Sequence, residues 1–459
     1  MEASDDPRFT RRELASAAAI LGAGMALAGS PPQGERRDTR TRPKTGQRSV
    51  FDLKHPPMKR VRVGMIGVGA RGNSLLGNLL DIEAVQITAL CDIVSGRVAK
   101  ACDRVCAKGQ PEPARFTRGE TDFENLCRRD GVDLVYVVTP WEWHVPMAVS
   151  AMRSGKHVAV EVPAAITVDG CWQLVNTAEQ TQRHCMMLEN CCYGETEMLV
   201  LNMVRQGMFG ELTHGEAGYL HGPGDGLLSP RDGAVWRRRH LMKHNGNLYP
   251  THGLGPLALY MGIHGGDRFD RLVSMSSHQC LLSLLRDRLP AGDPRRKETY
   301  ACGDVNTTMI QTALGRSIMV QFDIMTPQPY CRINAICGTS GAFRDYPPRI
   351  HLRGKGHGWE TNLAPYHQQH GHPLWKHHKA RAVESGGHGG MDYLMNWRLI
   401  HCLRQGLPLD MTVYDGAAWS SVFPLSIESV TKGNAPIAFP DFTRGEWKTR
   451  KNRLGAMDA

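Results

Sequence analysis

Short apolar runs alternate with amphipathic stretches through the first half of the chain. Five runs are rich in Val, Ile, Leu and Cys and end at polar residues, Gly or Pro: 61–66, 85–90, 132–138, 157–162 and 185–188. The segments between them have the spacing of helices. Buried strands that alternate with helices are typical of a doubly wound parallel sheet, so we expect an α/β fold in this half of the chain.

The first apolar run leads directly into a glycine-rich turn. Val61 to Ile66 is followed by Gly67, Val68, Gly69, Ala70, Arg71 and Gly72, and then by a helical stretch over 73–80. A strand, a Gly-x-Gly-x-x-Gly turn and a helix in this order form the Rossmann fingerprint, in which the glycines admit a pyrophosphate and the helix N-terminus favours an anion. The sequence therefore predicts a dinucleotide site.

The end of the second run indicates which dinucleotide binds. Asp92 lies 25 residues after Gly67, at the place where this fold positions an acid that binds the ribose. Because a carboxylate repels a 2′-phosphate, we expect NAD rather than NADP. The later strand ends carry Trp141 to His144, Glu161 with Val162, and Glu189 with Asn190. Each of these could bind a ligand at the carboxyl edge of the sheet or be an ordinary turn residue.

The N-terminus has the order of an export signal. Arg11 and Arg12 precede a weakly apolar stretch, 15–28, which ends in an Ala-x-Ala pattern at Ala26 and Ala28. The paired arginines resemble a twin-arginine signal, which predicts export of the folded protein to the periplasm or beyond; a tail with a chance Arg-Arg pair is the alternative. We assign 1–30 to the signal and 31–57, rich in Pro and charge, to a flexible linker before a body that begins near Met58.

Composition excludes several other classes of protein. The 459 residues are 41% hydrophobic and 22% charged, which suits a globular protein of two or three domains. No apolar run is long enough to span a membrane. The net charge is +10, but no run of basic residues is interleaved with aromatic residues as in a nucleic-acid site. The 13 cysteines include no Cys-x-x-Cys pair, so we expect mostly reduced thiols and no metal site.

Several longer motifs resemble a known superfamily. GMIGVGARG, TPWEWHVPMAV and AVEVPAA are similar to sequences of the Gfo/Idh/MocA oxidoreductases. That resemblance implies a Rossmann domain followed by a C-terminal α/β domain with a large open, mostly antiparallel sheet, which we place at 58–187 and 188–459. Many of those enzymes have Glu-Lys-Pro where this chain has Glu161, Val162 and Pro163, so the catalytic lysine is missing.

This departure points to one branch of the superfamily. WEWH at 141–144, MLENCCYGETEM at 187–198 and NLYPTHGLGP at 247–256 resemble glycoside hydrolase family 109, whose known members are NAD-dependent α-N-acetylgalactosaminidases. The resemblance implies that NAD is held, beyond the glycines, by Ala70, Arg71, Asp92, Trp141, Glu142, Trp143, His144, Glu161, Val162 and Asn190. It implies a sugar site lined by Tyr219, one arginine of 237–239 with Arg237 favoured, Tyr249, Pro250, Thr251, His252 and Tyr330.

An NAD site changes the chemistry expected of a glycosidase. Most glycosidases use two carboxylates, and NAD-dependent ones are exceptions. Oxidation at C3 of the sugar acidifies the proton at C2, so the aglycone leaves by elimination, water adds to the enone, and reduction restores the sugar with retention. His252 and Tyr249 share one Gly- and Pro-bounded turn and are the first candidates for the base. Tyr193 is the second candidate, with a buried aromatic as its alternative role.

The resulting hypothesis is an exported glycosidase that removes terminal α-linked N-acetylgalactosamine. An NAD-dependent sugar or cyclitol dehydrogenase and a non-catalytic NAD-binding regulator are the alternatives. We expect a small glycoside or glycan terminus as the partner, without nucleic acid or membrane, and leave homo-oligomer formation open. The group His370, His372, His377 and His378 is assigned to a solvated loop rather than a metal site, and the Gly386–Gly390 run to a flexible loop or a helix lead-in.

Overall fold

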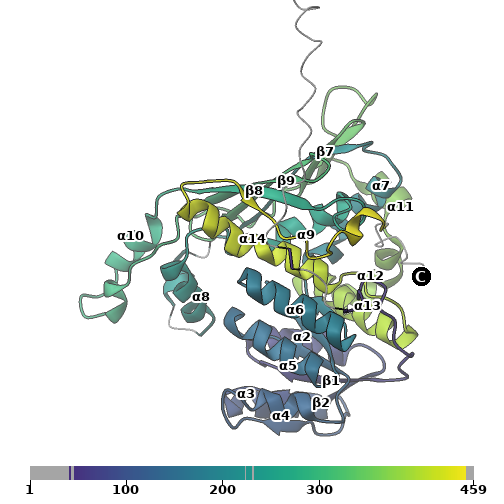
Figure 1. The fold of residues 1–459 in the computed structure, drawn as a ribbon, viewed down its shortest axis with the longest axis vertical. Coiled ribbons are helices and arrows are strands. Elements are labelled where there is room, and N and C mark those ends of the chain that lie inside the picture. Colours follow the sequence, from purple (N-terminus) through teal and green to yellow (C-terminus); the bar gives the residue numbers. More distant parts are fainter. Residues whose placement is uncertain (1–40, 43–45, 223, 230–231, 451–459) are drawn as a thin grey trace, which may run out of the picture. The chain divides into compact units, whose positions relative to one another are not determined.

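The computed structural model describes residues 41–42, 46–222, 224–229 and 232–450 (Figure 1). The expected signal at 1–30 and much of the expected linker lie outside these residues. The packed body begins earlier than Met58, because Val50 and Phe51 are buried and the Phe51 ring stacks on Tyr414 with ring centres 4.2 Å apart. An apolar pair within a polar segment is enough to anchor it, and the end of the segment assigned to a linker is part of the core.

The first half of the body is the expected doubly wound sheet. Its six strands are parallel and lie in the order β3-β2-β1-β4-β5-β6. They are β1 (Val61–Ile66), β2 (Val85–Cys91), β3 (Ala114–Phe116), β4 (Leu134–Val137), β5 (His157–Val160) and β6 (Cys185–Met187). The helices are α2 (Ala70–Leu80), α3 (Ser95–Ala107), α4 (Phe123–Arg128), α5 (His144–Arg153) and α6 (Val168–Thr181). The three-residue β3 was not predicted, since it is too short and too exposed to give an apolar run.

The second half contains a mixed, mostly antiparallel sheet of eight strands. Its order is β13-β12-β11-β7-β10-β9-β8-β14, and the β7–β10 pair is parallel whereas its other pairs are antiparallel. The strands are β7 (Leu212–Leu220), β8 (Phe269–Ser276), β9 (Asn306–Thr312), β10 (Ser317–Asp323), β11 (Ala335–Gly338), β12 (Gly341–Arg344), β13 (Arg349–Leu352) and β14 (Ile437–Ala438). This confirms the predicted fold class.

Helices join the two sheets into one packed unit. They are α7 (Glu195–Arg205), α8 (Asp232–Lys243), α9 (Thr251–Tyr260), α10 (Leu281–Asp287), α11 (Ala364–His370), α12 (Pro373–Ser385), α13 (Met391–Gln405) and α14 (Val413–Thr431). In Figure 1, α14 runs between α6 and the second sheet, and it packs on both α6 and β8. α13 packs on α2, so the last third of the chain returns to the Rossmann half. One continuous apolar core therefore crosses both halves.

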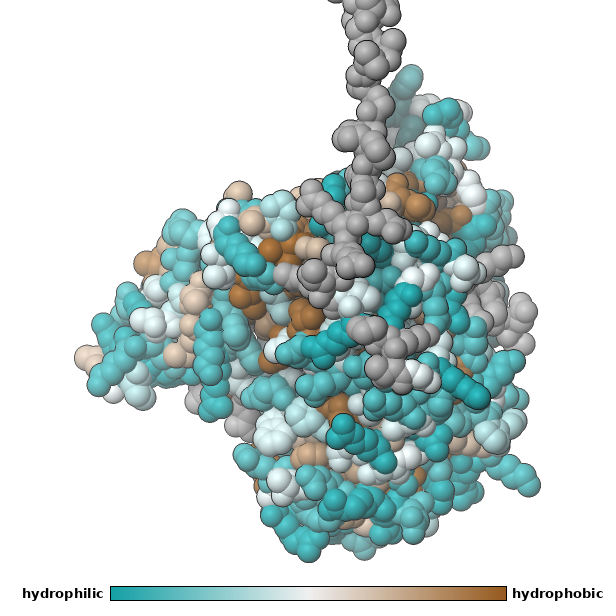
Figure 2. All heavy atoms as spheres, viewed as in Figure 1, coloured by the Kyte–Doolittle hydropathy of each residue, from teal (hydrophilic) through white to brown (hydrophobic). Residues whose placement is uncertain are grey.

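The surface and the minor predictions add little that affects the site. Most of the face in Figure 2 is hydrophilic, with apolar residues showing mainly over the second sheet. Within the described part of the chain, no helix is both long and apolar enough to cross a membrane. All 13 cysteines lie in that part and are free thiols. The assignment of the histidines near 370 to a loop is wrong for three of the four: His370 ends α11, and His377 and His378 lie in α12, whereas His372 lies between the two helices as the N-cap of α12.

Candidate active site

The glycine-rich turn after β1 is shaped for close approach of a ligand. Gly67 has φ +88, and a Cβ there would lie 2.2 Å from the carbonyl oxygen of Val138. A Cβ at Gly72 would lie 2.0 Å from the carbonyl oxygen of Gly67, so the helix packs against the turn at a distance only glycine allows. At Gly69 a Cβ would meet only the Arg97 guanidinium, at 4.0 Å. The turn thus leaves open backbone at the N-terminus of α2, where a dinucleotide pyrophosphate fits.

Asp92 is held rigidly at the carboxyl end of β2. Its two oxygens accept hydrogen bonds from the amides of Val68, at 3.0 Å, and Val94, at 2.9 Å. The carboxylate is therefore tied to the glycine-rich turn itself. Each oxygen keeps a second lone pair, which can accept from the hydroxyls of a ribose. The cradle and this acid together fit NAD, as the sequence predicted.

Arg71, one residue into α2, is the centre of a buried network of charges. Its Nε donates to Glu161 at 2.7 Å, and its two terminal nitrogens donate to the Asp392 carboxylate at 2.6 and 3.0 Å. Asn190 and His388 also lie against Asp392, at 2.8 and 2.9 Å. Burial lowers the pKa of Arg71, but the charges of Glu161 and Asp392 outweigh burial and raise it. The network fastens the cofactor-side turn to the N-terminus of α13.

Asp392 and His388 were not predicted as site residues. The nearest signal was the glycine run before Met391, which the structure shows to be a lead-in to α13 with positive φ at all five residues from Gly386 to Gly390. Asp392 has a fully buried side chain. Burial alone would raise its pKa, but hydrogen bonds from His388 and Arg71 outweigh burial and hold the pKa of Asp392 well below its usual range.

The four residues after β4 divide into two pairs. Trp141 and Glu142 face the second half: Trp141 lies edge-on to Trp236 with ring centres 4.9 Å apart, and Glu142 lies 3.4 Å from His240. Trp143 instead packs edge-on against a phenylalanine of α4, with ring centres 6.3 Å apart. The His144 nitrogens lie 2.8 Å from the carbonyl oxygens of Pro163 and Thr139.

These bonds give His144 a positioning role. A ring with both nitrogens against the backbone links the loops after β4 and β5, and it has no nitrogen free to bind NAD. Val162, in the position of the missing lysine, is buried and presents an apolar side chain.

His252 and Glu189 form a hydrogen-bonded pair between the two halves of the molecule. Glu189 follows β6, and His252 is the second residue of α9; His252 Nδ1 lies 2.7 Å from Glu189 Oε1. The Glu189 side chain is fully buried, which opposes its ionisation, but the charge and hydrogen bond of His252 hold the pKa of Glu189 below its usual value. In the neutral form of His252, Nδ1–H is donated to the carboxylate and Nε2 has a lone pair that can accept a proton. Glu189 was noted only as a strand-end residue, and its pairing was not predicted.

Aromatic residues of the predicted sugar site gather around His252. The Tyr219 ring centre lies 4.6 Å from that of Tyr249, 5.5 Å from His252 and 6.0 Å from Tyr330. The Tyr249 ring is 4.9 Å from His252 and 5.8 Å from Trp141, which connects this cluster to the cofactor side. Burial raises the pKa of Tyr249, so its phenol stays neutral and can donate a hydrogen bond. Pro250 and Thr251 are buried in the turn that carries Tyr249 and His252.

The structure separates the three arginines of α8. Arg238 is buried and pairs with Glu298 at 2.7 Å, which makes it a structural residue. Arg237 lies over the Trp236 ring at 4.8 Å, and its charge opposes the burial-driven rise in the pKa of Tyr219. Of the three arginines, Arg237 is therefore the one that faces the aromatic cluster. Arg238 is paired with Glu298 instead. The pKa of Glu142 is lowered mainly by its hydrogen bond with His240, and the charge of Arg239 adds to this effect.

Tyr193 does not join this cluster. Its side chain is buried to 1% exposure, and its hydroxyl donates to Asp410 at 3.1 Å. Asp410 in turn pairs with Arg398 at 2.9 Å. Burial raises the pKa of Tyr193 well above its usual value. The prediction of Tyr193 as a second base is therefore not supported, and the alternative of a buried aromatic with a satisfied hydroxyl describes it.

Comparison with known proteins agrees with this arrangement. Residues 61–189 match the model of the oxidoreductase family with an NAD-binding Rossmann fold, and residues 193–449 match the C-terminal domain of glycosyl hydrolase 109. A glycosyl hydrolase family 109 protein of Solibacter usitatus (strain Ellin6076) is 52% identical over 97% of this chain and 99% of its own length. A glycosyl hydrolase family 109 protein of Shewanella sp. (strain ANA-3) is 49% identical over 96% of this chain and 98% of its own length.

Solved structures share the fold at low sequence identity. Levoglucosan dehydrogenase in complex with NADH is 17% identical, with a TM-score of 0.65 over 83% of this chain and all of that chain. Scyllo-inositol dehydrogenase from Lactobacillus casei with NAD(H) and scyllo-inositol has a TM-score of 0.59 at 14% identity, over 83% of this chain and 99% of that chain. NAD is the cofactor that this site takes, and the chain belongs to glycosyl hydrolase family 109.

Proposed function

We propose that this glycoside hydrolase removes terminal α-linked N-acetylgalactosamine by oxidation, elimination, water addition and reduction, with retention at C1. The observation that carries the proposal is the Glu189–His252 pair, in which a buried carboxylate fixes an imidazole between a dinucleotide cradle and an aromatic cluster. The family motifs support the choice of sugar.

The carboxylates near the site argue for this route over the usual glycosidase mechanism. A direct hydrolysis needs two carboxyl groups placed on either side of the glycosidic bond. Glu161 and Asp392 are both bonded to Arg71, and Glu189 is bonded to His252. Each of the three is thus engaged by a partner, and the pKa values of Asp392 and Glu189 are lowered, which suits positioning better than acid catalysis.

NAD, when bound, would supply an acceptor for the hydride from C3 of the sugar, while the proton of the C3 hydroxyl passes to a base; both return to the sugar at the end of the cycle. Once C3 carries a carbonyl, the hydrogen on C2 becomes acidic, and we assign its removal to His252 Nε2. Glu189 keeps the Nδ1 proton in place and stabilises the imidazolium that forms. The aglycone then leaves C1 with the bonding electron pair and takes up a proton, which gives an enone. Water adds across this double bond, with its hydroxyl on C1 from the original face and its proton on C2, so the configuration is retained.

Two other side chains have roles that follow from their protonation and position. The neutral Tyr249 hydroxyl can donate to the oxygen at C3 as negative charge develops on it. The Arg237 guanidinium can donate to the acetamido carbonyl or a ring hydroxyl, because a planar fork of N–H groups is suited to fixed acceptors. Tyr219 and Tyr330 supply aromatic faces around the ring.

A panel of nitrophenyl glycosides tests the proposal. Purified enzyme should release nitrophenol from the α-N-acetylgalactosaminide while absorbance at 340 nm stays constant, because no net oxidation occurs. Accumulation of NADH would identify a dehydrogenase instead, and neither signal would identify a binding protein. Val162 in place of lysine counts against the dehydrogenase.

Isotope and substrate changes test the mechanism itself. Hydrolysis in D₂O should place deuterium at C2 of the released sugar, since the abstracted proton exchanges with solvent. A 3-deoxy substrate should not react, because C3 then has no hydroxyl to oxidise. Cleavage of the 3-deoxy substrate at a normal rate would contradict the redox cycle.

We also propose that the protein is exported folded, by the twin-arginine route. Arg11 and Arg12 carry this proposal, and both lie outside the described residues. An enzyme that needs NAD benefits from export after folding, because the cofactor then travels inside the protein. Replacing both arginines by lysine should leave the precursor in the cytoplasm, and unchanged export would contradict the proposal.

A further inference from the structure

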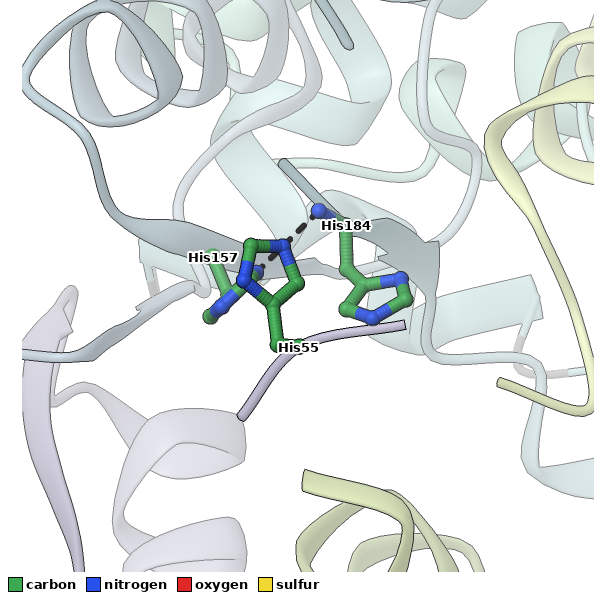
Figure 3. A group of neighbouring side chains, drawn as sticks. All are labelled: His55, His157 and His184. Atoms are coloured by element: carbon green, nitrogen blue, oxygen red, sulfur yellow. Dashed lines mark hydrogen bonds between the residues drawn. The ribbon is translucent and has the colours of Figure 1, made fainter. Parts of the chain in front are cut away.

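Three histidines meet at the edge of the Rossmann sheet that lies opposite the active site. His157 is the first residue of β5, and His184 directly precedes β6, so both lie at the amino ends of parallel strands. His55 comes from the segment that precedes β1. Figure 3 shows the His55 and His157 rings close together and nearly perpendicular, with the His184 ring beside them. Cofactors bind at the carboxyl ends of such strands, so this group is separate from the catalytic site.

The spacing of the rings matches shared coordination of one ion. The donor atoms of the three side chains all lie within 4.8 Å of one another. The ring centres are 5.0 Å apart for His157 and His184, 5.4 Å for His55 and His184, and 4.2 Å for His55 and His157. Imidazoles that share one tetrahedral zinc ion at about 2.0–2.1 Å have ring centres roughly 5 Å apart. Small rotations of the rings would therefore complete the geometry.

The nitrogens are in suitable states to act as ligands. His184 is only 6% exposed, and its Nε2 is buried without a hydrogen-bond partner among the described residues. His55 Nε2 lies 3.1 Å from the carbonyl oxygen of Gln182, which fixes its proton there and leaves the Nδ1 lone pair free. Burial lowers the pKa of His184 to about 3 and also lowers that of His157, so both rings are neutral, as a metal ligand must be.

Two features oppose binding. His157 Nδ1 accepts a hydrogen bond from the His184 amide at 3.2 Å, shown as the dashed line in Figure 3. A metal-bound neutral imidazole keeps its proton on the other nitrogen, so this bond is lost whichever nitrogen coordinates. The Arg183 guanidinium is also near, donating to the carbonyl oxygen of Gly155 at 2.7 Å. Neutral nitrogen donors beside a positive charge favour an ion that binds imidazole strongly over a hard ion such as Mg²⁺.

We propose that His55, His157 and His184 form a second site that binds one divalent transition-metal ion, with Zn²⁺ as the reference ion and water as its fourth ligand. The ion joins the segment before β1 to the amino edge of the sheet. That segment is also held by Val50 and Phe51 at one end, by the His55–Gln182 hydrogen bond, and by the bond from the Met58 amide to Leu403 at the other end. The site has a structural role and takes no part in the reaction.

Zinc binding to the untagged, chelator-treated full-length protein tests the proposal. We expect one equivalent of Zn²⁺ by calorimetry and by metal analysis, and a higher melting temperature with Zn²⁺ than without it. Co²⁺ in the same site should show the visible bands of tetrahedral coordination. His184→Gln and, as a variant at a more exposed position, His55→Gln should each weaken binding at least about tenfold, the lower end of what loss of an outer partner costs a metal site.

The matched control separates this site from the active site. Glu189, Cys191 and His252 also place donor atoms within 4.8 Å of one another, so His252→Gln is compared in parallel. We expect His252→Gln to keep the zinc stoichiometry and the shift in melting temperature. Absence of bound zinc in the wild type would overturn the proposal and leave a packed group of neutral imidazoles. Loss of zinc in His252→Gln with retention in His55→Gln and His184→Gln would overturn it as well.

Discussion

Buried ionisable groups are charged at one edge of the Rossmann sheet and neutral at the other. At the carboxyl edge, Arg71, Asp392 and Glu189 remain charged because each has an oppositely charged or protonated partner within 3 Å. At the amino edge, burial lowers the pKa of His157 and His184 and keeps both rings neutral. A buried charge is retained only where the fold supplies a counter-charge, and otherwise the group loses its charge. The edge that carries the chemistry is thus the edge with counter-charges.

The largest effect is expected at the Glu189–His252 pair. His252→Gln keeps the size of the side chain but cannot transfer a proton, so kcat should fall by about 10²- to 10⁴-fold. NAD should remain bound, because His252 belongs to the second half of the chain. Steady-state kinetics and the NAD content of the purified variant check both statements. His351→Gln, on the outer strand β13, is the control and should keep wild-type kcat.

The network at Arg71 comes next. Asp392→Asn preserves shape but leaves the guanidinium with Glu161 alone, and breaking a buried ion pair costs about 3–5 kcal/mol of unfolding free energy. The variant should also release NAD more easily on gel filtration, since Arg71 lies at the start of α2. Glu124→Gln breaks an exposed pair with Arg128 and should change stability by less than about 1 kcal/mol. Equal effects in the two variants would mean that the counter-charges at the carboxyl edge matter no more than those on the surface.

The amino edge should respond to pH in the metal-free protein. The pKa of His184 is about 3 when folded and about 6.5 when unfolded, so the unfolded state binds more protons between these values. The stabilising contribution is complete above pH 6.5 and is lost as pH falls toward 3. Between pH 7.5 and 5 the loss is about 2 kcal/mol. Denaturant unfolding of wild type and His184→Phe at both pH values checks this, and an unchanged pH slope in the variant would contradict it.

The smallest effect is expected at Tyr193. Tyr193→Phe removes the hydroxyl that donates to Asp410, which keeps its partner Arg398, so stability should fall by about 1 kcal/mol. The kcat should stay within about threefold of wild type, because the hydroxyl is bonded to Asp410 and not to His252. A fall in kcat comparable to that of His252→Gln would restore Tyr193 as a base.

Local sequence predicted the parts of the fold and site that depend on neighbours in the chain. The strand at Val61–Ile66, the glycine turn and Asp92 follow from a pattern confined to about 30 residues, and the structure reproduces the pattern. Pairings between distant residues were beyond that reasoning. Asp392 reaches Arg71 across 321 positions, and Glu189 reaches His252 across 63. Nothing near either carboxylate in the sequence indicates its partner.

Side-chain direction was the second limit. Tyr193 follows Asn190 in one short helical turn, Asn190–Tyr193, yet the two side chains bond to different carboxylates, Asp392 and Asp410. Three successive arginines on α8 likewise point to three different surroundings, and only the packed structure distinguishes Arg237 from Arg238. A strand-end position indicates where a residue lies, but its contacts depend on the elements that pack around it.

The contact between Arg71 and Asp392 also orders the events of synthesis. The ribosome adds Asp392 321 residues after Arg71, which takes about 15 to 65 s at roughly 5–20 residues per second. During that interval the Rossmann half can complete its own sheet and take up NAD, but its guanidinium has only Glu161 as a partner. The last third of the chain therefore makes its contact with Arg71 late in synthesis, when the cofactor domain has already formed.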